Sequence, residues 1–185
     1  MSALPPPNQS AILQFWFDEL TPQQHFAKDA LLDAAIARRF GATLAAAARG
    51  ELFGWRSTAR GRLAEILVLD QFSRNVYRDT PRAFAQDGMA LLLAQELVAS
   101  GQARTLPATQ RAFAYMPYMH SESPLVQAEA LRLFAEPGLE ANLPFAQRHQ
   151  AIIERFGRYP HRNAILGRQS SDEELAFLQQ PGSSF

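Results

Sequence analysis

The sequence predicts an all-α protein of about eight helices, arranged as antiparallel helical hairpins in a short helical solenoid or a compact bundle. Three observations support this prediction. Helix-capping signals recur along the chain, strand-like alternation of apolar and polar residues is absent, and the expected connections are short, which favours antiparallel neighbours. The 185 residues fit one domain, 1–185, which can bury about two thirds of its unfolded surface.

Proline, hydroxyl residues and glycine mark where the expected helices begin and end. A capping hydroxyl precedes a proline at three starts, Thr21, Thr80 and Ser123. Ser171 and Glu174 have the spacing of a capping box. Glycine, which favours the left-handed C-terminal cap, closes three apolar segments, at Gly50, Gly101 and Gly157. The expected helices span residues 10–19, 30–49, 58–73, 81–100, 108–118, 124–135, 144–156 and 172–180.

Charge and cysteine content narrow the classes of function. The 18 basic and 18 acidic residues cancel, so the electrostatic signature of a nucleic-acid-binding protein is missing and no nucleic-acid partner is expected. The absence of cysteine excludes thiolate chemistry and favours a reducing compartment, which makes the cytoplasm the expected location. Met1–Pro7 does not resemble a signal peptide, and the apolar runs fall short of the ~20 residues that span a bilayer, so no membrane is expected as a partner.

In the segment Leu69–Arg78, the helix face that is apolar in the preceding residues becomes polar. The face formed by residues 63–67 continues, three and four residues on, at Asp70, Gln71 and Arg74. If Asp70 and Arg74 are buried they must pair, because an unpartnered interior charge costs several kcal/mol. Two interpretations stay open: a structural ion pair, or a base, acid or anion clamp that faces a cavity.

A second polar segment is expected on a tight turn between helices. His120 and Glu122 follow an expected break at Met116–Pro117 and precede the helix that begins at Ser123. His120 could act as a general base, a metal ligand or a capping donor, and Glu122 could orient its second ring nitrogen.

The third polar segment, Arg155–Arg168, is stiffened by Gly157 and Pro160. Five arginines and one acid lie between residues 148 and 168, so the local charge is positive and suits a phosphate or a carboxylate. The alternative is that these arginines bind backbone carbonyls at helix ends. His149 shares an apolar helix face and is expected to be a core histidine.

Several familiar catalytic motifs are missing. The P-loop, the Gly-x-Gly-x-x-Gly fingerprint, His-Glu-x-x-His and the nucleophile elbow do not occur, so P-loop hydrolases, Rossmann dehydrogenases, zincins and α/β hydrolases find no support. A mixed metal site is an alternative because imidazole and carboxylate suit zinc, manganese or iron, and its ligands would be Asp70, His120, Glu122 and His161. The spacing does not demand a metal, and the cofactor stays open.

Four separated segments carry a resemblance to a known family: Phe15–Phe17, Leu69–Asn75, Met116–Glu122 and Arg155–Arg168. Through them the chain resembles the bacterial family catalogued as domain of unknown function 924, whose members share an all-helical, tetratricopeptide-like fold. Relatives often have proline at the position of Ser73, which implies a helix end or kink there and a turn beyond it. The resemblance supplies no activity.

These segments lead to three hypotheses. The first is a small-molecule site for an anionic or polar ligand, with hydrolysis among its reactions. Its catalytic or metal-binding candidates are Asp70, His120, Glu122 and His161, and its ligand-binding candidates are Arg74, Asn75, Arg158, Arg162, Asn163 and Arg168. The second is a peptide-binding module, which predicts exposed aromatic side chains at Trp16, Tyr115 or Tyr118. The third is a ligand-free polar network that fixes the packing of the helices.

Overall fold

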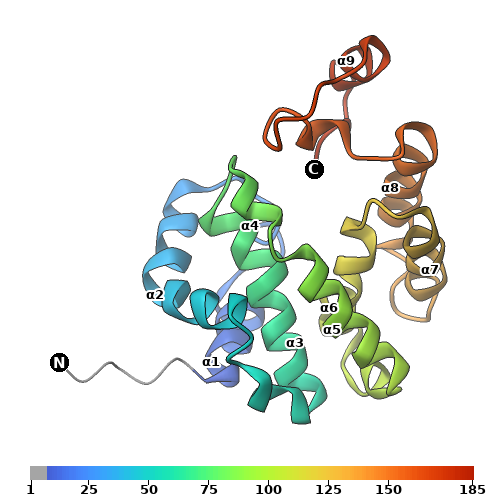
Figure 1. Ribbon diagram of the computed structural model, residues 1–185. Coiled ribbons are helices and arrows are strands. Elements are labelled where there is room, and N and C mark those ends of the chain that lie inside the picture. Colours follow the sequence, from blue (N-terminus) through green and yellow to red (C-terminus); the bar gives the residue numbers. More distant parts are fainter. Residues whose placement is uncertain (1–7) are drawn as a thin grey trace.

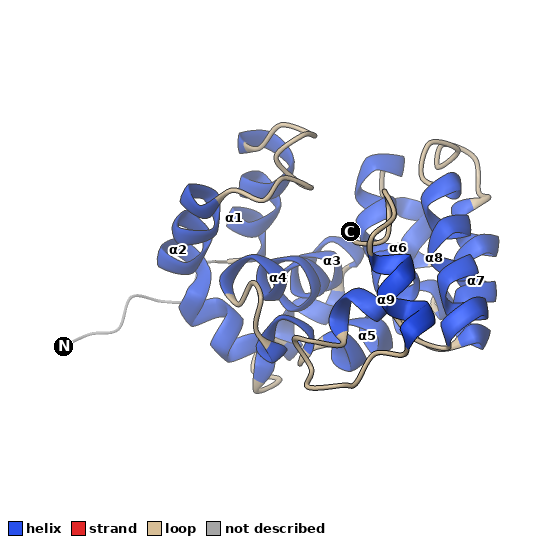
Figure 2. Cartoon of the chain, turned by 90° about the horizontal axis from the view of Figure 1, so that it is seen from above, coloured by secondary structure: helices blue, strands red, loops and turns tan. Residues whose placement is uncertain are grey.

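A computed structural model describes residues 8–185 of the chain, and every regular element within them is helical (Figure 2). The all-α prediction is therefore confirmed. Met1–Pro7, which we expected not to form a signal peptide, lie outside the described residues.

The N-terminal elements surround an aromatic core. Helix α1 (Gln9–Gln14) continues directly into a π-helical turn, η1 (Phe15–Glu19), and α2 (Ala30–Ala48) begins where the Asp29 carboxylate accepts hydrogen bonds from the backbone of the first helical turn. The rings of Phe15, Phe40 and Phe72 lie 5.0–6.1 Å apart, centroid to centroid. The expected start at Thr21 was wrong, because the residues after it form only turns.

The central helix contains an irregular turn. Helix α3 (Ala59–Leu67) passes without a break through a π-helical turn, η3 (Val68–Phe72), into α4 (Ser73–Val76). The chain is therefore helical three residues beyond the expected end, and the turn that the resemblance implied after Ser73 does not form here. A short 3₁₀ turn, η2 (Phe53–Ser57), precedes α3.

Two expected boundaries around α5 and α6 were wrong. The segment 81–100 is not one helix, because a 3₁₀ turn, η4 (Pro81–Phe84), and a short break precede α5 (Asp87–Ala99). Helix α6 (Ala108–His120) runs straight through Pro117, so His120 belongs to its last turn and not to the connection that follows. A proline keeps helical φ and removes a single hydrogen bond, which a helix can lose near its end.

The last three helices lie within two residues of the expected bounds. They are α7 (Pro124–Phe134), α8 (Leu143–Phe156) and α9 (Asp172–Leu178). Two short 3₁₀ turns, η5 (Gln102–Thr105) and η6 (Pro160–Arg162), were not expected. The capping box of Ser171 and Glu174 forms as expected. The three closing glycines adopt left-handed backbone, with φ of 73°, 72° and 68° at Gly50, Gly101 and Gly157.

Helices α3 and α6 lie in contact at the centre of the bundle (Figure 1). Helices α1 and α5 also pack on α3, α2 packs on α4, and α7 packs against both α6 and α8. A smaller core of Ile152, Ile153 and Tyr159 joins the C-terminal segment to α8. None of the helices within residues 8–185 combines the length and the apolar character that crossing a bilayer requires.

The start of α3 is packed so closely that only glycine fits at position 61. A Cβ atom on Gly61 would lie 2.0 Å from the carbonyl oxygen of Trp55 and 2.0 Å from Oε1 of Gln9. We expect Gly61→Ala to lower the free energy of unfolding by about 1–3 kcal/mol, because backbone must move. In the matched control Gly41→Ala, no atom lies within 4 Å of the new Cβ. This change should raise stability by up to ~1 kcal/mol through helix propensity. Urea unfolding measures both, and equal effects would contradict the packing argument.

Candidate functional site

A buried aspartate and a histidine from distant segments meet at the C-terminal ends of α3 and α6. Asp70 lies in the π-helical turn and is 1% exposed. Its Oδ1 accepts a hydrogen bond from Nδ1 of His120 at 2.7 Å, and its Oδ2 accepts one from Nε2 of Gln71 at 2.5 Å. Nη1 of Arg74 lies 3.1 Å from Oδ1, which confirms the expected pairing four residues on.

The π-helical turn lies within a long buried stretch of the central helix. All residues from Leu63 to Ser73 are buried, the regular part of α3 included, so this helix is enclosed on all sides. Turns with this wider hydrogen-bonding pattern occur mostly as single insertions in α-helices and are frequent at functional sites. The periodicity of the sequence gave no sign of it.

The charge states of the pair follow from burial and from neighbouring charges. Burial would raise the pKa of Asp70, but the charges of Arg74 and His120 and the hydrogen bonds from His120 and Gln71 together hold it well below its usual range. Burial lowers the pKa of His120; Asp70 opposes this shift and the Arg74 charge adds to it. At neutral pH the pair is therefore an ionised carboxylate beside a neutral imidazole.

This charge state fixes the tautomer of His120. An ionised carboxylate can only accept, so Nδ1 carries the proton and donates it to Asp70. Nε2 is left with a lone pair. It makes no hydrogen bond with any residue from 8 to 185, and it is accessible to solvent. An imidazole held in this way can accept a proton from a bound molecule or from water.

Two arginines share one aspartate beside the pair. Asp87, in the first turn of α5, accepts two hydrogen bonds from Arg74, at 2.8 and 3.0 Å, and one from Nη1 of Arg162 at 3.3 Å. Nη2 of Arg162 donates to the backbone carbonyl of His120 at 3.0 Å, while its Nε is buried without a partner among the described residues. Arg162 therefore links η6 to the end of α6 and to the start of α5.

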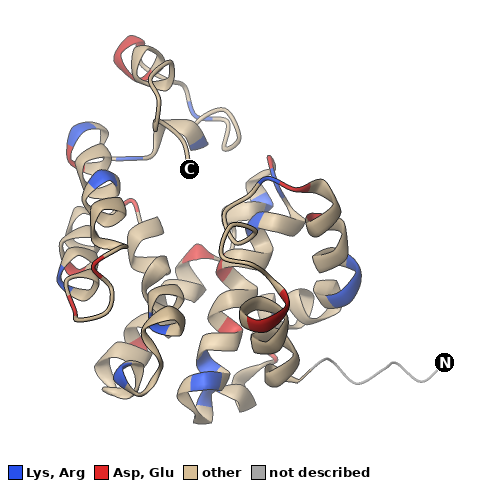
Figure 3. Cartoon of the chain, turned by 180° about the vertical axis from the view of Figure 1, so that it is seen from behind, with Lys and Arg blue, Asp and Glu red and all other residues tan. Residues whose placement is uncertain are grey.

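The fixed charges of this cluster compensate one another. Asp70 and Asp87 carry two negative charges, and Arg74 and Arg162 carry two positive ones. Figure 3, which views the protein from behind, likewise shows basic and acidic residues interleaved along the helices. The arginines are thus already neutralised, and an anionic ligand would have to compete with a carboxylate of the protein for them.

Glu122 has a different partner from the one that we expected. Its Oε2 and Oε1 accept hydrogen bonds from Arg168 at 2.7 and 2.9 Å, and Oε1 also accepts from the backbone N–H of Tyr159 at 2.8 Å. Burial would raise the pKa of Glu122, but these hydrogen bonds and the Arg168 charge lower it. Asp70, and not Glu122, therefore orients His120, and Glu122 fixes the loop after α8.

The other ligand-binding candidates each have local partners. Asn75 donates to Asp33 at 2.8 Å, and Arg158 binds both carboxylate oxygens of Glu174 at 2.7 Å. Asn163 accepts from Arg168 at 2.9 Å and donates to Ser170 at 3.1 Å. The structure thus brings Asp70, His120, Arg74 and Arg162 together, and ties the remaining candidates to neighbours of their own.

His161 lies near this cluster without being hydrogen-bonded to it. Its Nδ1 is buried and has no partner among residues 8–185. Burial, followed by the charge of Arg162, lowers its pKa to about 4, so it is neutral at pH 7. The ring of Phe185 covers it at a centroid distance of 4.6 Å. The role of His161 stays a prediction.

In the described part of the chain, the side chains that could bind a metal do not gather in one place. Within residues 8–185 there is no group of three or more histidine, aspartate and glutamate side chains that could hold a metal ion. Asp70 and Glu122 are each bound to donors of the protein. The prediction of exposed aromatic side chains, which a peptide groove would require, was wrong. Trp16, Tyr115 and Tyr118 are 0%, 1% and 3% exposed, so they belong to the core.

Comparisons with known proteins give a family and one structural relative. The family model described as "Bacterial protein of unknown function (DUF924)" matches residues 12–182. The structure of the protein of unknown function ATU0120 from Agrobacterium tumefaciens is 38% identical, covers 92% of this chain and 96% of its own, and superposes with a TM-score of 0.88. A comparison with curated proteins yields no significant match.

Buried histidines should make the protein sensitive to mild acid. Burial lowers the pKa of His149 to about 3 from an ordinary value of 6.5, although its Nδ1–H donates to the carbonyl of Phe145. Below pH 6.5 the unfolded chain binds a proton that the folded chain does not, so stability is full above this pH and falls as the pH drops. We expect a loss of about 2 kcal/mol from His149 alone between pH 7.5 and pH 5.

The measurement is urea unfolding at both pH values. His149→Gln should lower the difference between them by about 2 kcal/mol, because glutamine does not titrate. Gly41→Ala, which leaves all histidines in place, should keep the difference of the unchanged protein. A difference that is the same in all three proteins would show that folding does not lower the pKa of His149.

Proposed function

This chain belongs to the bacterial protein family of unknown function DUF924, and we propose that it binds a small polar molecule at the Asp70–His120 pair, where His120 acts as a general base. One observation carries the proposal: a neutral imidazole is held through Nδ1 by a buried, ionised carboxylate, and its Nε2 makes no hydrogen bond with any described residue. Hydrolysis is the reaction class that this arrangement fits best.

The chemistry requires only that a bound molecule place an electrophilic carbon or phosphorus near Nε2. His120 would take a proton from water through Nε2, the water oxygen would attack the electrophile, and the proton would then pass to the leaving group. Asp70 would keep the ring oriented and stabilise the imidazolium, as the third member of a base-orienting chain does. Arg162 would hold the backbone of His120 in place through its hydrogen bond to the carbonyl.

The compensated charges bear on the class of ligand. Because Arg74 and Arg162 already share Asp87, a neutral polar ligand fits without breaking an ion pair. An anionic ligand could bind only by displacing Asp87 from one arginine. We expect this chemistry to take place in the cytoplasm, on the ground of the missing cysteines.

The same compensation favours a second candidate, a polar network without a ligand. Asp70 is buried and paired with Arg74 of α4 and His120 of α6, and Asp87 of α5 joins Arg74 to Arg162 of η6, so the cluster alone could fix how these elements pack. Tetratricopeptide-like stacking and a peptide groove stay predictions, and the buried aromatics give them no support.

Two substitutions, each of which nearly keeps the size of the side chain, test the proposal. His120→Gln removes the base, Asp70→Asn removes its orienting charge, and His149→Gln is the control because it removes a buried histidine elsewhere. The measurement is hydrolysis of a panel of small esters, amides and phosphate esters. We expect kcat/KM to fall by about 10²–10⁴-fold in His120→Gln and to stay within threefold in the control. The rate should also fall as the pH drops through the lowered pKa of His120, because only the neutral imidazole accepts a proton.

Unfolding measurements on the same proteins distinguish the two candidates. If Asp70→Asn lowers the free energy of unfolding by about 3–5 kcal/mol while no panel member is hydrolysed above background, the ligand-free network is supported. Turnover that His120→Gln leaves unchanged would contradict a base at this position.

A further inference from the structure

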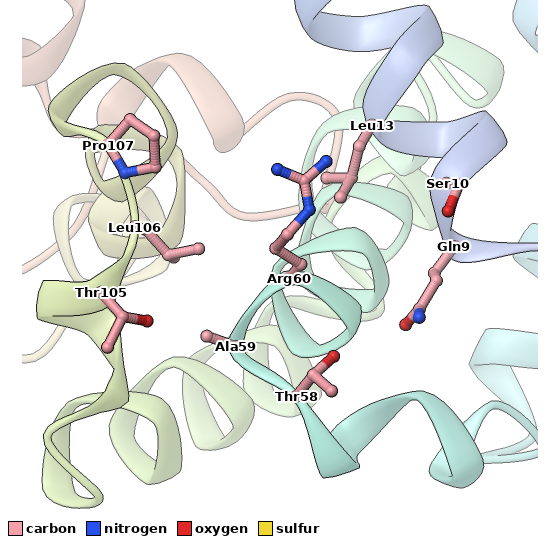
Figure 4. Close-up of a pocket in the computed structure, with 9 residues that line it drawn as sticks. All are labelled: Gln9, Ser10, Leu13, Thr58, Ala59, Arg60, Thr105, Leu106 and Pro107. Atoms are coloured by element: carbon pink, nitrogen blue, oxygen red, sulfur yellow. The ribbon is translucent and has the colours of Figure 1, made fainter.

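A cavity of about 440 Å³ lies at the opposite end of α3 and α6 from the Asp70–His120 pair. It opens between the start of α1, the start of α3 and the segment that leads into α6 (Figure 4). Small-molecule sites in proteins typically have volumes of about 300–1,000 Å³. The residues that line it are Gln9, Ser10, Leu13, Thr58, Ala59, Arg60, Thr105, Leu106 and Pro107.

Arg60 is the one charged residue among the described residues that line this cavity. Its side chain extends between α1 on one side and residues 105–107 on the other (Figure 4). Most arginines of the protein lie against a carboxylate, as Arg56 does on Glu65 and Arg158 on Glu174. Arg60 has no hydrogen bond and no ion pair with any residue from 8 to 185, so the cavity contains an uncompensated positive charge.

The surroundings of Arg60 add donors and no competing acid. Ser10, Thr58 and Thr105 contribute hydroxyl groups, and Oγ1 of Thr58 accepts from the N–H of Gly61 at 3.1 Å, which leaves its own proton free to donate. The first turns of α3 and α6 also border the cavity, and their partial positive charge adds to that of Arg60. An anionic group is therefore the polar group that this cavity suits.

Pro107, which is exposed, and Ala59, which is partly buried, supply the accessible apolar surface of the lining. Leu13 and Leu106, on opposite sides of Arg60, are 3% and 4% exposed, so only the edge of each side chain reaches the cavity. A small anion without an apolar part would leave the apolar surface of the cavity exposed to water, whereas a short hydrocarbon chain would cover it.

We propose that this cavity is a second binding site, which takes a small organic monoanion with a short apolar chain, such as a medium-chain carboxylate. The carboxylate binds Arg60 and the hydroxyl groups, and the chain lies against Pro107 and Ala59. Ten residues of helix separate Arg60 from Asp70, or about 15 Å, so this site and the Asp70–His120 pair are independent proposals.

Isothermal titration calorimetry of the full chain with three probes tests this site. Octanoate supplies both the charge and the chain, acetate only the charge, and 1-octanol only the chain. We expect octanoate to bind at least tenfold more tightly than either of the others. Acetate or octanol binding as tightly as octanoate would overturn the proposal, since one of the two halves of the site would then contribute nothing.

Two arginine substitutions locate the site. Arg60→Gln should weaken octanoate binding by tenfold or more, because a charge-assisted hydrogen bond is lost. Arg38→Gln is the matched control, since Arg38 is also exposed and has no ion pair within residues 8–185; it should change the affinity by less than twofold. Arg60→Lys, which keeps the charge, should retain more affinity than Arg60→Gln. Equal affinity in Arg60→Gln and the unchanged protein would overturn the assignment, provided that amide NMR spectra show both folded.

Discussion

The buried carboxylate of Asp70 is the constraint on which the centre of this structure depends. A charge that is 1% exposed must be satisfied, and three side chains do so, from its own helix and from the end of α6. Because His120 is one of them, the last turn of α6 is fixed against the π-helical turn after α3. Arg162 then binds the carbonyl of His120, which joins the C-terminal segment to the same point.

Much of this centre could be predicted from the sequence, because its pairs are close in the chain or marked by unusual composition. Asp70 and Arg74 are four residues apart on one helix face, and the polar character of the segments around His120 and Arg162 set them apart from an apolar protein. Asp87 was missed. Its partners are 13 and 75 residues away, and a single acid at the start of a helix looks like an ordinary solvent-exposed residue.

The helical phase was the other part that the sequence could not supply. Apolar periodicity shows which residues face the core, but it does not distinguish a hydrogen bond to the fourth residue from one to the fifth, so the turn at Val68–Phe72 was invisible. Pro117 misled in the opposite direction. Proline often ends a helix, yet α6 continues through Pro117 to His120 and loses the one backbone hydrogen bond that the proline cannot donate. The roles of Glu122 and of the remaining arginines depended on contacts between distant segments.

The π-helical turn has a consequence for how this protein can vary. A π-helical turn holds one residue more than an α-helical turn, so deleting one residue between Val68 and Phe72 would restore the α-helical pitch and leave the phase of α4 nearly unchanged. Arg74 and Asn75 would keep their directions toward Asp87 and Asp33, whereas Asp70, inside the turn, would shift. A deletion in the regular part of α3 would instead rotate everything after it by roughly 100° around the axis. A change of one residue in length is therefore best absorbed within this turn, at the expense of the contacts of Asp70.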